Sequence, residues 1–319
     1  MDDTFFCAPG TWKLYACTAC GSGYLNPRPT RESIQNAYRD YYTHTDPKPA
    51  TADFQLTRAH YVQRALANGY RNWRYGCDFT PSSKLGILAA MMLPGYREIV
   101  HREFRHIPRL VAGSRLLDVG AGDGEFLARV SGAGWVSVGV EPDATARAVA
   151  QQRGLDVRDG NIETLLGDEP ERFDVITLNH VIEHAHDPRQ MMASAYSLLR
   201  PGGCLYIDTP NINSLGHRQF GRHWRGLEAP RHIVLFNWSS LLSLLNEAGF
   251  RRVTRWPQSH IYLSLAAASR AISKGLDPTP ASTNSINDYL LAAWTKVKTP
   301  IWHNDSEFVT VTAFKPNDA

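Results

Sequence analysis

The sequence has no apolar run long enough to cross a membrane. The longest stretch, Leu85 to Leu93, ends at Pro94 and falls well short of the ~20 residues that a spanning helix needs. The chain begins with Met1 and two aspartates, so it also lacks the basic start and apolar segment of a signal peptide. We therefore expect a protein without a membrane span that works in the cytoplasm.

Long runs of like charge are also missing. The formal net charge of the 319 residues is only +3, and no stretch carries five or more charges of one sign, so electrostatics do not indicate a nucleic-acid partner. The sequence shows no internal repeat and no low-complexity segment. With 43% hydrophobic and 20% charged residues, the composition suits a globular chain of one large domain plus additions.

The sequence has only five cysteines, an odd number. In a cytoplasmic chain, five cysteines indicate thiols or metal ligands more than disulfides. Cys17 and Cys20, followed by Gly21, form half of a zinc knuckle, but a structural zinc site needs four ligands. Only Cys7 joins them near the amino terminus. The alternatives are a zinc site completed by a histidine and unliganded thiols in a small hairpin. The five cysteines are residues 7, 17, 20, 77 and 204.

The chain is organised around a glycine-rich stretch. Residues 115–119 have the apolar and β-branched character of a buried strand, and an amphipathic helix begins near Asp123. Between them, Gly120, Gly122 and Gly124 remove side chains where the backbone must turn sharply. A ligand can therefore approach the amino terminus of the helix closely.

The spacing of these glycines distinguishes two ligand classes. The dinucleotide fingerprint needs its third glycine at position 125, where the sequence has Glu125. With Asp118 before the first glycine, the pattern D-x-G-x-G-x-G resembles the first motif of the class I S-adenosylmethionine-dependent methyltransferases. The resemblance implies that this loop binds S-adenosylmethionine through Asp118, Gly120, Gly122 and Gly124.

Later segments follow the order of that family. Residues 136–141 alternate like a strand and end in Glu141, about 20 residues beyond the glycines, where a carboxylate accepts from ribose hydroxyls. Asn161 and Ile162 stand where the family contacts adenine, although an Asp is more common there. Asn179 ends the next predicted strand, at the same edge of the sheet, and is also expected to bind the cofactor. Tyr41 and Tyr42 match tyrosines that lie over the methionine end of the cofactor in relatives.

Strands and helices alternate from residue 114 to about 210, which predicts a doubly wound α/β fold. We expect a Rossmann-like sheet of about seven strands, whose last strand, 308–314, is antiparallel. The predicted domains are a cysteine-containing head (1–30), a helical cap (31–110) and a methyltransferase domain (111–319) with insertions at 211–236 and 260–300. The head resembles a short cysteine-containing segment that precedes some bacterial methyltransferases acting on sugars and related metabolites.

The sequence predicts the acceptor of the methyl group less specifically than it predicts the cofactor. A hydroxyl acceptor needs a general base, and histidine suits that role because its pKa lies near working pH. His180 is our first candidate and His232 the second, with His184 and His223 also considered. Trp224, Arg225 and Arg231 are the predicted acceptor-side residues. The resemblance implies a small-molecule acceptor, methylated on a hydroxyl or a sugar carbon of a saccharide or secondary metabolite.

Alternatives remain at this point. His180, Glu183 and His184 would present a divalent metal if their segment were helical. The Asn/Asp-Pro-Pro-Tyr sequence of enzymes that methylate amino groups on adenine is absent, which disfavours nucleic acid as the acceptor. We still weigh an RNA methyltransferase that uses the cysteine head as its clamp, a non-catalytic cofactor-binding module and a nicotinamide dehydrogenase.

Overall fold

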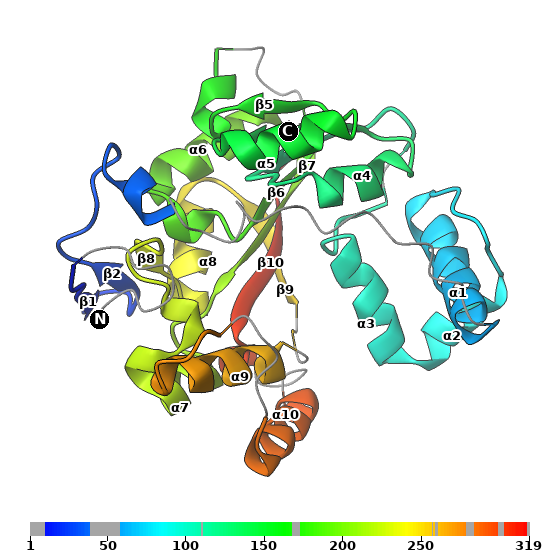
Figure 1. The fold of residues 1–319 in the computed structure, drawn as a ribbon. Coiled ribbons are helices and arrows are strands. Elements are labelled where there is room, and N and C mark those ends of the chain that lie inside the picture. Colours follow the sequence, from blue (N-terminus) through cyan, green and yellow to red (C-terminus); the bar gives the residue numbers. More distant parts are fainter. Residues whose placement is uncertain are drawn as a thin grey trace. The chain divides into compact units, whose positions relative to one another are not determined.

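The computed structural model describes residues 10–38, 58–109, 111–167, 173–256, 258, 261–278, 284–298 and 303–317. Within them, seven strands form one sheet in the order β5-β4-β3-β6-β7-β10-β9 (Figure 1). This sheet confirms the predicted doubly wound α/β fold. The strands are β3 (Arg115–Val119), β4 (Val136–Glu141), β5 (Val157–Asp159), β6 (Phe173–Asn179), β7 (Leu199–Pro210), β9 (Arg251–Trp256) and β10 (Phe308–Phe314).

The direction of the strands changes near one edge of the sheet. β3 pairs in parallel with β4, and β4 pairs in parallel with β5. β10 lies between β7 and β9 and runs antiparallel to β9, as predicted. In β10, Val309 and Val311 are buried, and so are Thr310 and Thr312, which point to the opposite face. Both faces of this strand are therefore covered.

Helices connect the strands of this sheet. They are α4 (Glu125–Ser131), α5 (Ala144–Gln152), α6 (Pro188–Leu198) and α8 (Trp238–Glu247), with single 3-10 turns at η3 (Ile162–Leu165) and η4 (Ile182–His184). Asp143 caps α5 by accepting a hydrogen bond from the backbone N–H of Ala146 at 2.7 Å, and Asn237 forms a capping box with Ser240 on α8. These side chains satisfy backbone donors that a helix start leaves unpaired.

Both predicted insertions contain helices. The first holds α7 (Leu215–Phe220), the 3-10 turns η5 (Gly221–His223) and η6 (Arg225–Leu227), and strand β8 (Val234–Leu235). The second holds α9 (Tyr262–Ser273) and α10 (Ile286–Lys298), and η7 (His303–Asp305) follows it. Trp224 and Leu227 from the first insertion pack in one apolar cluster with Ile212 and Leu235.

The amino-terminal segment is a hairpin, as the sequence suggested, but it does not stand alone. β1 (Leu14–Ala16) pairs antiparallel with β2 (Gly23–Leu25), and β2 pairs antiparallel with β8 of the first insertion. After the hairpin, the described residues form the short 3-10 helix η1 (Ile34–Tyr38). The domain boundary at residue 30 stays a prediction.

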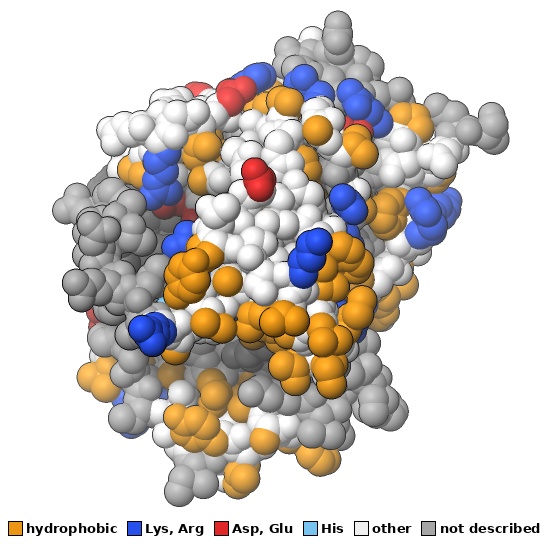
Figure 2. Space-filling model, turned by 90° about the vertical axis from the view of Figure 1, so that its right-hand side faces the viewer, with side chains coloured by type: hydrophobic (Ala, Val, Ile, Leu, Met, Phe, Trp, Pro, Cys, Tyr) orange, Lys and Arg blue, Asp and Glu red, His pale blue; other side chains and the backbone are white. Residues whose placement is uncertain are grey.

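The segment predicted to be a helical cap contains α1 (Arg58–Tyr75), α2 (Leu85–Met92) and α3 (Pro94–Glu103). α2 carries no charged residue and exposes Leu85, Leu88, Met91 and Met92. Figure 2 views the molecule from the right-hand side of Figure 1 and shows hydrophobic side chains gathered on this face. None of the helices in the described ranges is both long and apolar enough to cross a membrane.

Contacts divide the chain into two compact units. One comprises residues 1–42, 178–196 and 207–314, and the other comprises residues 43–177, 197–206 and 315–319. The first unit contains the histidines singled out in the sequence. The second contains the glycine-rich loop and Glu141.

Candidate functional site

The glycine-rich loop connects β3 to α4 with three left-handed residues. Gly120, Gly122 and Gly124 have φ angles of +67°, +55° and +80°, which L side chains rarely adopt. A Cβ at Gly124 would lie 2.4 Å from the side chain of Leu155, whereas a Cβ at Gly122 would meet nothing within 4 Å. Gly124 is therefore needed for packing, while Gly122 leaves open space beside the backbone.

Glu141 ends β4 with its carboxylate turned to this loop. Its Oε2 accepts a hydrogen bond from the backbone N–H of Gly122 at 2.8 Å, and its Oε1 accepts one from Asp143 at 2.9 Å. Burial raises the pKa of Glu141, and these two N–H donors oppose the shift. Each carboxylate oxygen has a second lone pair, so the group can still accept hydrogen bonds from two hydroxyls.

Asp118, at the end of β3, is almost fully buried. Its Oδ1 accepts hydrogen bonds from the hydroxyl of Thr177, at 2.8 Å, and from Arg105, while its Oδ2 is buried without a partner. Burial raises the pKa of this carboxyl, and Arg105 and Thr177 counteract it. Arg105 also lies over the ring of Phe126, 3.7 Å from its centroid. Nothing in the sequence pointed to Arg105.

These residues fit S-adenosylmethionine. The open space at Gly122 admits a ligand close to the backbone, Glu141 retains capacity for a ribose diol, and the unpaired Oδ2 of Asp118 can accept from an ammonium group. Asn161 is exposed at the start of η3, and Ile162 is fully buried. The predicted adenine contact of these two residues stays a prediction. Tyr41 and Tyr42 lie outside the described residues.

One variant tests the part that Glu141 plays. We expect Glu141→Ala to weaken binding of S-adenosylmethionine by about 1–3 kcal/mol, because the ribose hydroxyls lose their acceptor. Calorimetric titration of the purified chain measures this change. Asp159→Ala is the matched control, since Asp159 ends the neighbouring strand β5 but is exposed. Equal affinities of the Glu141 variant and the unaltered chain would show that the cofactor's ribose binds elsewhere.

The first unit contains His180, directly after β6. It has a φ of +56°, a conformation that is uncommon for residues other than glycine and concentrates at functional sites. Its side chain is 39% exposed, and its Nδ1 lies 3.4 Å from Oε1 of Glu183. Its Nε2 lies 3.8 Å from Oδ2 of Asp208. Burial disfavours the imidazolium, but these carboxylates outweigh that effect and raise the pKa of His180.

Asp208 is itself held in place by two side chains. The hydroxyl of Thr310 donates to its Oδ1 at 2.6 Å, and the amide of Gln258 donates to its Oδ2 at 3.2 Å. The backbone N–H of His180 also donates to the carbonyl of Asp208 at 2.8 Å. A histidine that is open to solvent on one side and backed by an oriented carboxylate can take up a proton. Sequence reasoning missed both Asp208 and Gln258.

The other histidines lie in different environments. The Nδ1 of His232 lies 2.8 Å from the carbonyl of Gly226, and burial lowers the pKa of His232 to about 4. The Nδ1 of His184 lies 3.0 Å from the carbonyl of Arg231. His223 is half-buried beside Arg222. His180 is therefore the most accessible histidine of those that a carboxylate supports.

The predicted acceptor-side residues organise the first insertion. The indole N–H of Trp224, a buried residue, donates to Oε2 of Glu307 at 2.8 Å. Arg231 is fully buried and donates to the carbonyl of Ala37 at 2.8 Å, and Arg225 forms an ion pair with Glu228. These contacts hold the segment together. Contact of the three predicted residues with an acceptor stays a prediction.

Glu307 makes the stability of this segment depend on pH. Burial raises its pKa to about 7, against hydrogen bonds from Gly216 and Trp224. The folded chain thus binds more protons than the unfolded one between the ordinary carboxyl pKa and 7, so this group's contribution to stability falls as pH rises through that window. Glu307→Gln removes the titration. We expect its unfolding free energy, relative to the unaltered chain, to rise by about 1–3 kcal/mol between pH 5 and pH 8.

Urea unfolding of both proteins at the two pH values gives this difference. The change of Glu307 to glutamine also has a pH-independent cost, because the amide replaces one acceptor with a donor. Only the change of the difference with pH is therefore informative. A difference that is the same at pH 5 and pH 8 would show that Glu307 does not titrate in this range.

Neither of the two metal sites predicted from the sequence forms a complete ligand set among the described residues. Cys17 and Cys20 lie in the turn between β1 and β2, where the thiol of Cys20 donates to Ser22 at 3.4 Å, and Cys7 lies outside the described residues. The zinc head is not confirmed. The helical face of His180, Glu183 and His184 is wrong, because the segment forms only the short 3-10 turn η4. Within the described part of the chain, the residues that gather as possible ligands are Glu183, His184 and His232.

Known proteins resemble parts of this chain. Ubiquinone biosynthesis O-methyltransferases from Pseudomonas entomophila and Xanthomonas euvesicatoria are 34% and 36% identical over 109 and 108 residues. Each match covers 32% of this chain and 47% or 45% of the relative. The chain thus matches about half the length of these curated relatives.

Solved structures of low sequence identity were also found. A SAM-dependent methyltransferase from Archaeoglobus fulgidus is 22% identical, covers 72% of this chain and 99% of its own, and has a TM-score of 0.48. Phosphoethanolamine N-methyltransferase 2 from Haemonchus contortus is 18% identical, covers 85% of this chain and 62% of its own, and has a TM-score of 0.49.

The family comparison covers more of the chain. A sequence model described as a methyltransferase domain matches residues 92–255, just over half of the chain. The match includes the glycine-rich loop, Glu141 and His180. The chain therefore belongs to the methyltransferase-domain family, in the class I group that takes S-adenosylmethionine as its methyl donor.

Proposed function

We propose that this protein transfers a methyl group from S-adenosylmethionine to a hydroxyl of a small-molecule acceptor, such as a saccharide or another secondary metabolite. The observation that carries the proposal is His180, accessible on one side and backed by the carboxylates of Glu183 and Asp208. The matched relatives are named as O-methyltransferases, which supports oxygen over carbon or nitrogen as the methylated atom.

In the proposed mechanism, the carbon–sulfur bond that breaks is already activated in the methyl donor. S-adenosylmethionine supplies a methyl group that is already activated by its sulfonium sulfur. The chain has to align an acceptor oxygen with that methyl group, and alignment can contribute ~7 kcal/mol or more to lowering the barrier. In this mechanism Glu141 and the glycine-rich loop hold the cofactor. Their position at the carboxyl ends of β3 and β4 is the usual place for a ligand of such a sheet.

In this mechanism His180 acts as the general base. As the acceptor oxygen forms its bond to the methyl carbon and the carbon–sulfur bond breaks, the hydroxyl proton passes to the imidazole of His180. The carboxylates of Glu183 and Asp208 then stabilise the imidazolium. His232 suits this role less well, because it is buried and its pKa lies far below working pH. Its side chain is therefore a weak base with little access to an acceptor.

A screen for methyl transfer tests the proposal. Purified chain is incubated with labelled donor and three acceptor sets: hydroxylated metabolites, nucleotide sugars and RNA. We expect label in a hydroxylated small molecule, at an ether oxygen. Label in RNA alone would overturn the small-molecule assignment, and the RNA-clamp alternative would then gain support from salt-dependent binding. Label on carbon or nitrogen would overturn the role of His180 as a hydroxyl base.

A further inference from the structure

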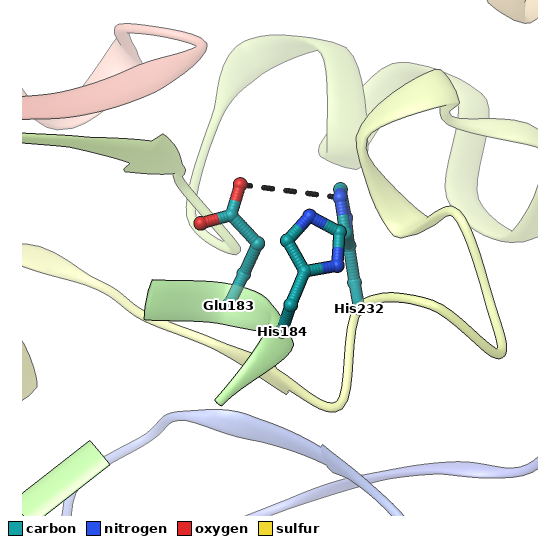
Figure 3. Close-up of side chains that lie close together, drawn as sticks. All are labelled: Glu183, His184 and His232. Atoms are coloured by element: carbon teal, nitrogen blue, oxygen red, sulfur yellow. Dashed lines mark ion pairs between the residues drawn. The ribbon is translucent and has the colours of Figure 1, made fainter. Parts of the chain in front are cut away.

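A second cluster of polar side chains is drawn in Figure 3. It shares Glu183 with the proposed base His180 and lies in the same unit. Glu183 and His184 belong to η4, and His232 comes from the first insertion. One potential ligand atom of each residue lies within 4.8 Å of the other two. Glu183 and His232 are buried, whereas His184 is half-buried, so solvent can reach the cluster from one side.

One carboxylate oxygen in this cluster is unsatisfied. Oε2 of Glu183 accepts a hydrogen bond from the hydroxyl of Thr209 at 3.0 Å, but Oε1 is buried and has no hydrogen-bond partner. The side chain of Glu183 is fully buried. Leaving such an oxygen unpaired costs more than an ordinary lost hydrogen bond. A cation between Oε1 and the facing imidazoles would remove that cost.

The two imidazoles are oriented as metal ligands are. The Nδ1 of His232 lies 2.8 Å from the carbonyl of Gly226, and the Nδ1 of His184 lies 3.0 Å from the carbonyl of Arg231. A carbonyl can only accept, so the Nδ1 of His232 carries the proton and its neutral ring keeps a lone pair on Nε2. The Nδ1 of His184 also lies 2.9 Å from the hydroxyl of Tyr38, which can accept as well as donate, and the metal site needs the same tautomer of His184. Ligating histidines typically donate their other nitrogen to a backbone carbonyl in this way.

A hydrogen bond from His232 to a neighbouring carboxylate does not explain how these three side chains are arranged. Its Nε2 lies 3.9 Å from Oε1 of Glu183 and 3.7 Å from Oε2 of Glu228. Both distances are too long for a hydrogen bond. Glu228 is already paired with Arg225 and Arg231, whereas Oε1 of Glu183 has the imidazole of His180 3.4 Å away and makes no hydrogen bond. The unpaired oxygen of Glu183 is the feature that points to a ligand.

We propose that Glu183, His184 and His232 bind one divalent transition-metal ion, through Oε1 of the glutamate and Nε2 of each histidine. Two imidazoles favour zinc and its first-row neighbours over magnesium or calcium. In a tetrahedral zinc site, ligand atoms are about 3.3 Å apart, so the carboxylate and His232, now 3.9 Å apart, would move closer by about half an ångström. A pair at the 4.8 Å limit of the cluster would move closer by about 1.5 Å. Three protein ligands leave one position open to water or another oxygen.

The test is metal binding by the full chain, which does not depend on methyl transfer. Chain stripped with a chelator is titrated with Co²⁺ and, separately, with Zn²⁺. We expect one ion per chain and visible cobalt absorption without a thiolate charge-transfer band. Glu183→Gln and His232→Ala should abolish this binding. Thr209→Val, which removes only the hydrogen bond to Glu183, should weaken it about 10- to 100-fold.

Two controls accompany these variants. His223→Ala changes a histidine of the same insertion outside the cluster, and the Cys17→Ser, Cys20→Ser double variant removes the thiols of the head. Both should bind metal normally. The proposal is overturned if the unaltered chain binds no ion, if Glu183→Gln binds it normally, or if the cobalt spectrum shows thiolate ligands. Should His232→Ala fail to fold by circular dichroism, the unaltered chain and Glu183→Gln still decide the question.

Discussion

Replacing His180 with glutamine should lower methyl transfer by about 100-fold or more, while the affinity for S-adenosylmethionine stays within a few-fold. Only the transition state uses the proton transfer, so the loss should appear in turnover and not in cofactor binding. Glutamine keeps hydrogen-bonding groups near Glu183 and Asp208 but cannot act as a base at neutral pH. Turnover against pH, measured with an acceptor found in the screen, gives the result.

The pH profile separates a base from a packing residue. A general base must be neutral to act, so activity of the unaltered chain should fall as pH drops through the pKa of His180, and this limb should disappear in His180→Gln. His60→Gln, at an exposed histidine of α1, is the matched control and should behave like the unaltered chain. If His180→Gln keeps a near-normal rate and the same limb, alignment alone carries the reaction.

Replacing Gly122 with valine should abolish detectable binding of S-adenosylmethionine in a chain that still folds. Gly122 has a φ of +55°, and the space beside its Cα is open. A β-branched side chain would fill that space and would strain the left-handed backbone. The N–H of Gly122 also donates to Glu141, so a shift of the loop would displace the ribose acceptor. Calorimetric titration measures the loss.

Gly134→Val is the matched control for this variant. Gly134 also has a left-handed backbone, with a φ of +73°, and a Cβ added there would meet no atom within 4 Å, but it lies before β4 and outside the loop. The strain of ~1–2 kcal/mol per left-handed residue should therefore lower the stability of both variants. Only Gly122→Val should lose the cofactor. Equal affinity in both variants would place the cofactor away from this loop.

Local sequence patterns predicted the strands and the cofactor loop well. The apolar run of β3, the glycines and the start of α4 follow one another along the chain, so their structure depends mainly on neighbours in sequence. Glu141 could be predicted because it ends a strand at the expected distance from the glycines. The alternation of β10 predicted a strand, but its antiparallel direction was expected from the family resemblance, and its place between β7 and β9 is seen only in the structure.

Contacts between distant residues could not be predicted. Asp208 meets Thr310, which lies 102 positions later, and β2 pairs with β8 of the first insertion. His232 joins Glu183 only because the insertion folds back over η4, where the backbone N–H of Ile233 donates to the carbonyl of Glu183 at 2.8 Å. Periodicity and motif spacing carry no information on such pairings. The resemblance likewise gave no reason to link Arg105 with Asp118.

The central claim is that the glycine-rich loop and Glu141 bind a sulfonium cofactor. Calorimetric titration of the purified chain with S-adenosylmethionine, S-adenosylhomocysteine and NAD tests it most directly. We expect one S-adenosylmethionine and one S-adenosylhomocysteine per chain, and no binding of NAD, because Glu125 replaces the third glycine of the dinucleotide fingerprint. Tight binding of NAD without binding of either sulfur compound would contradict the account.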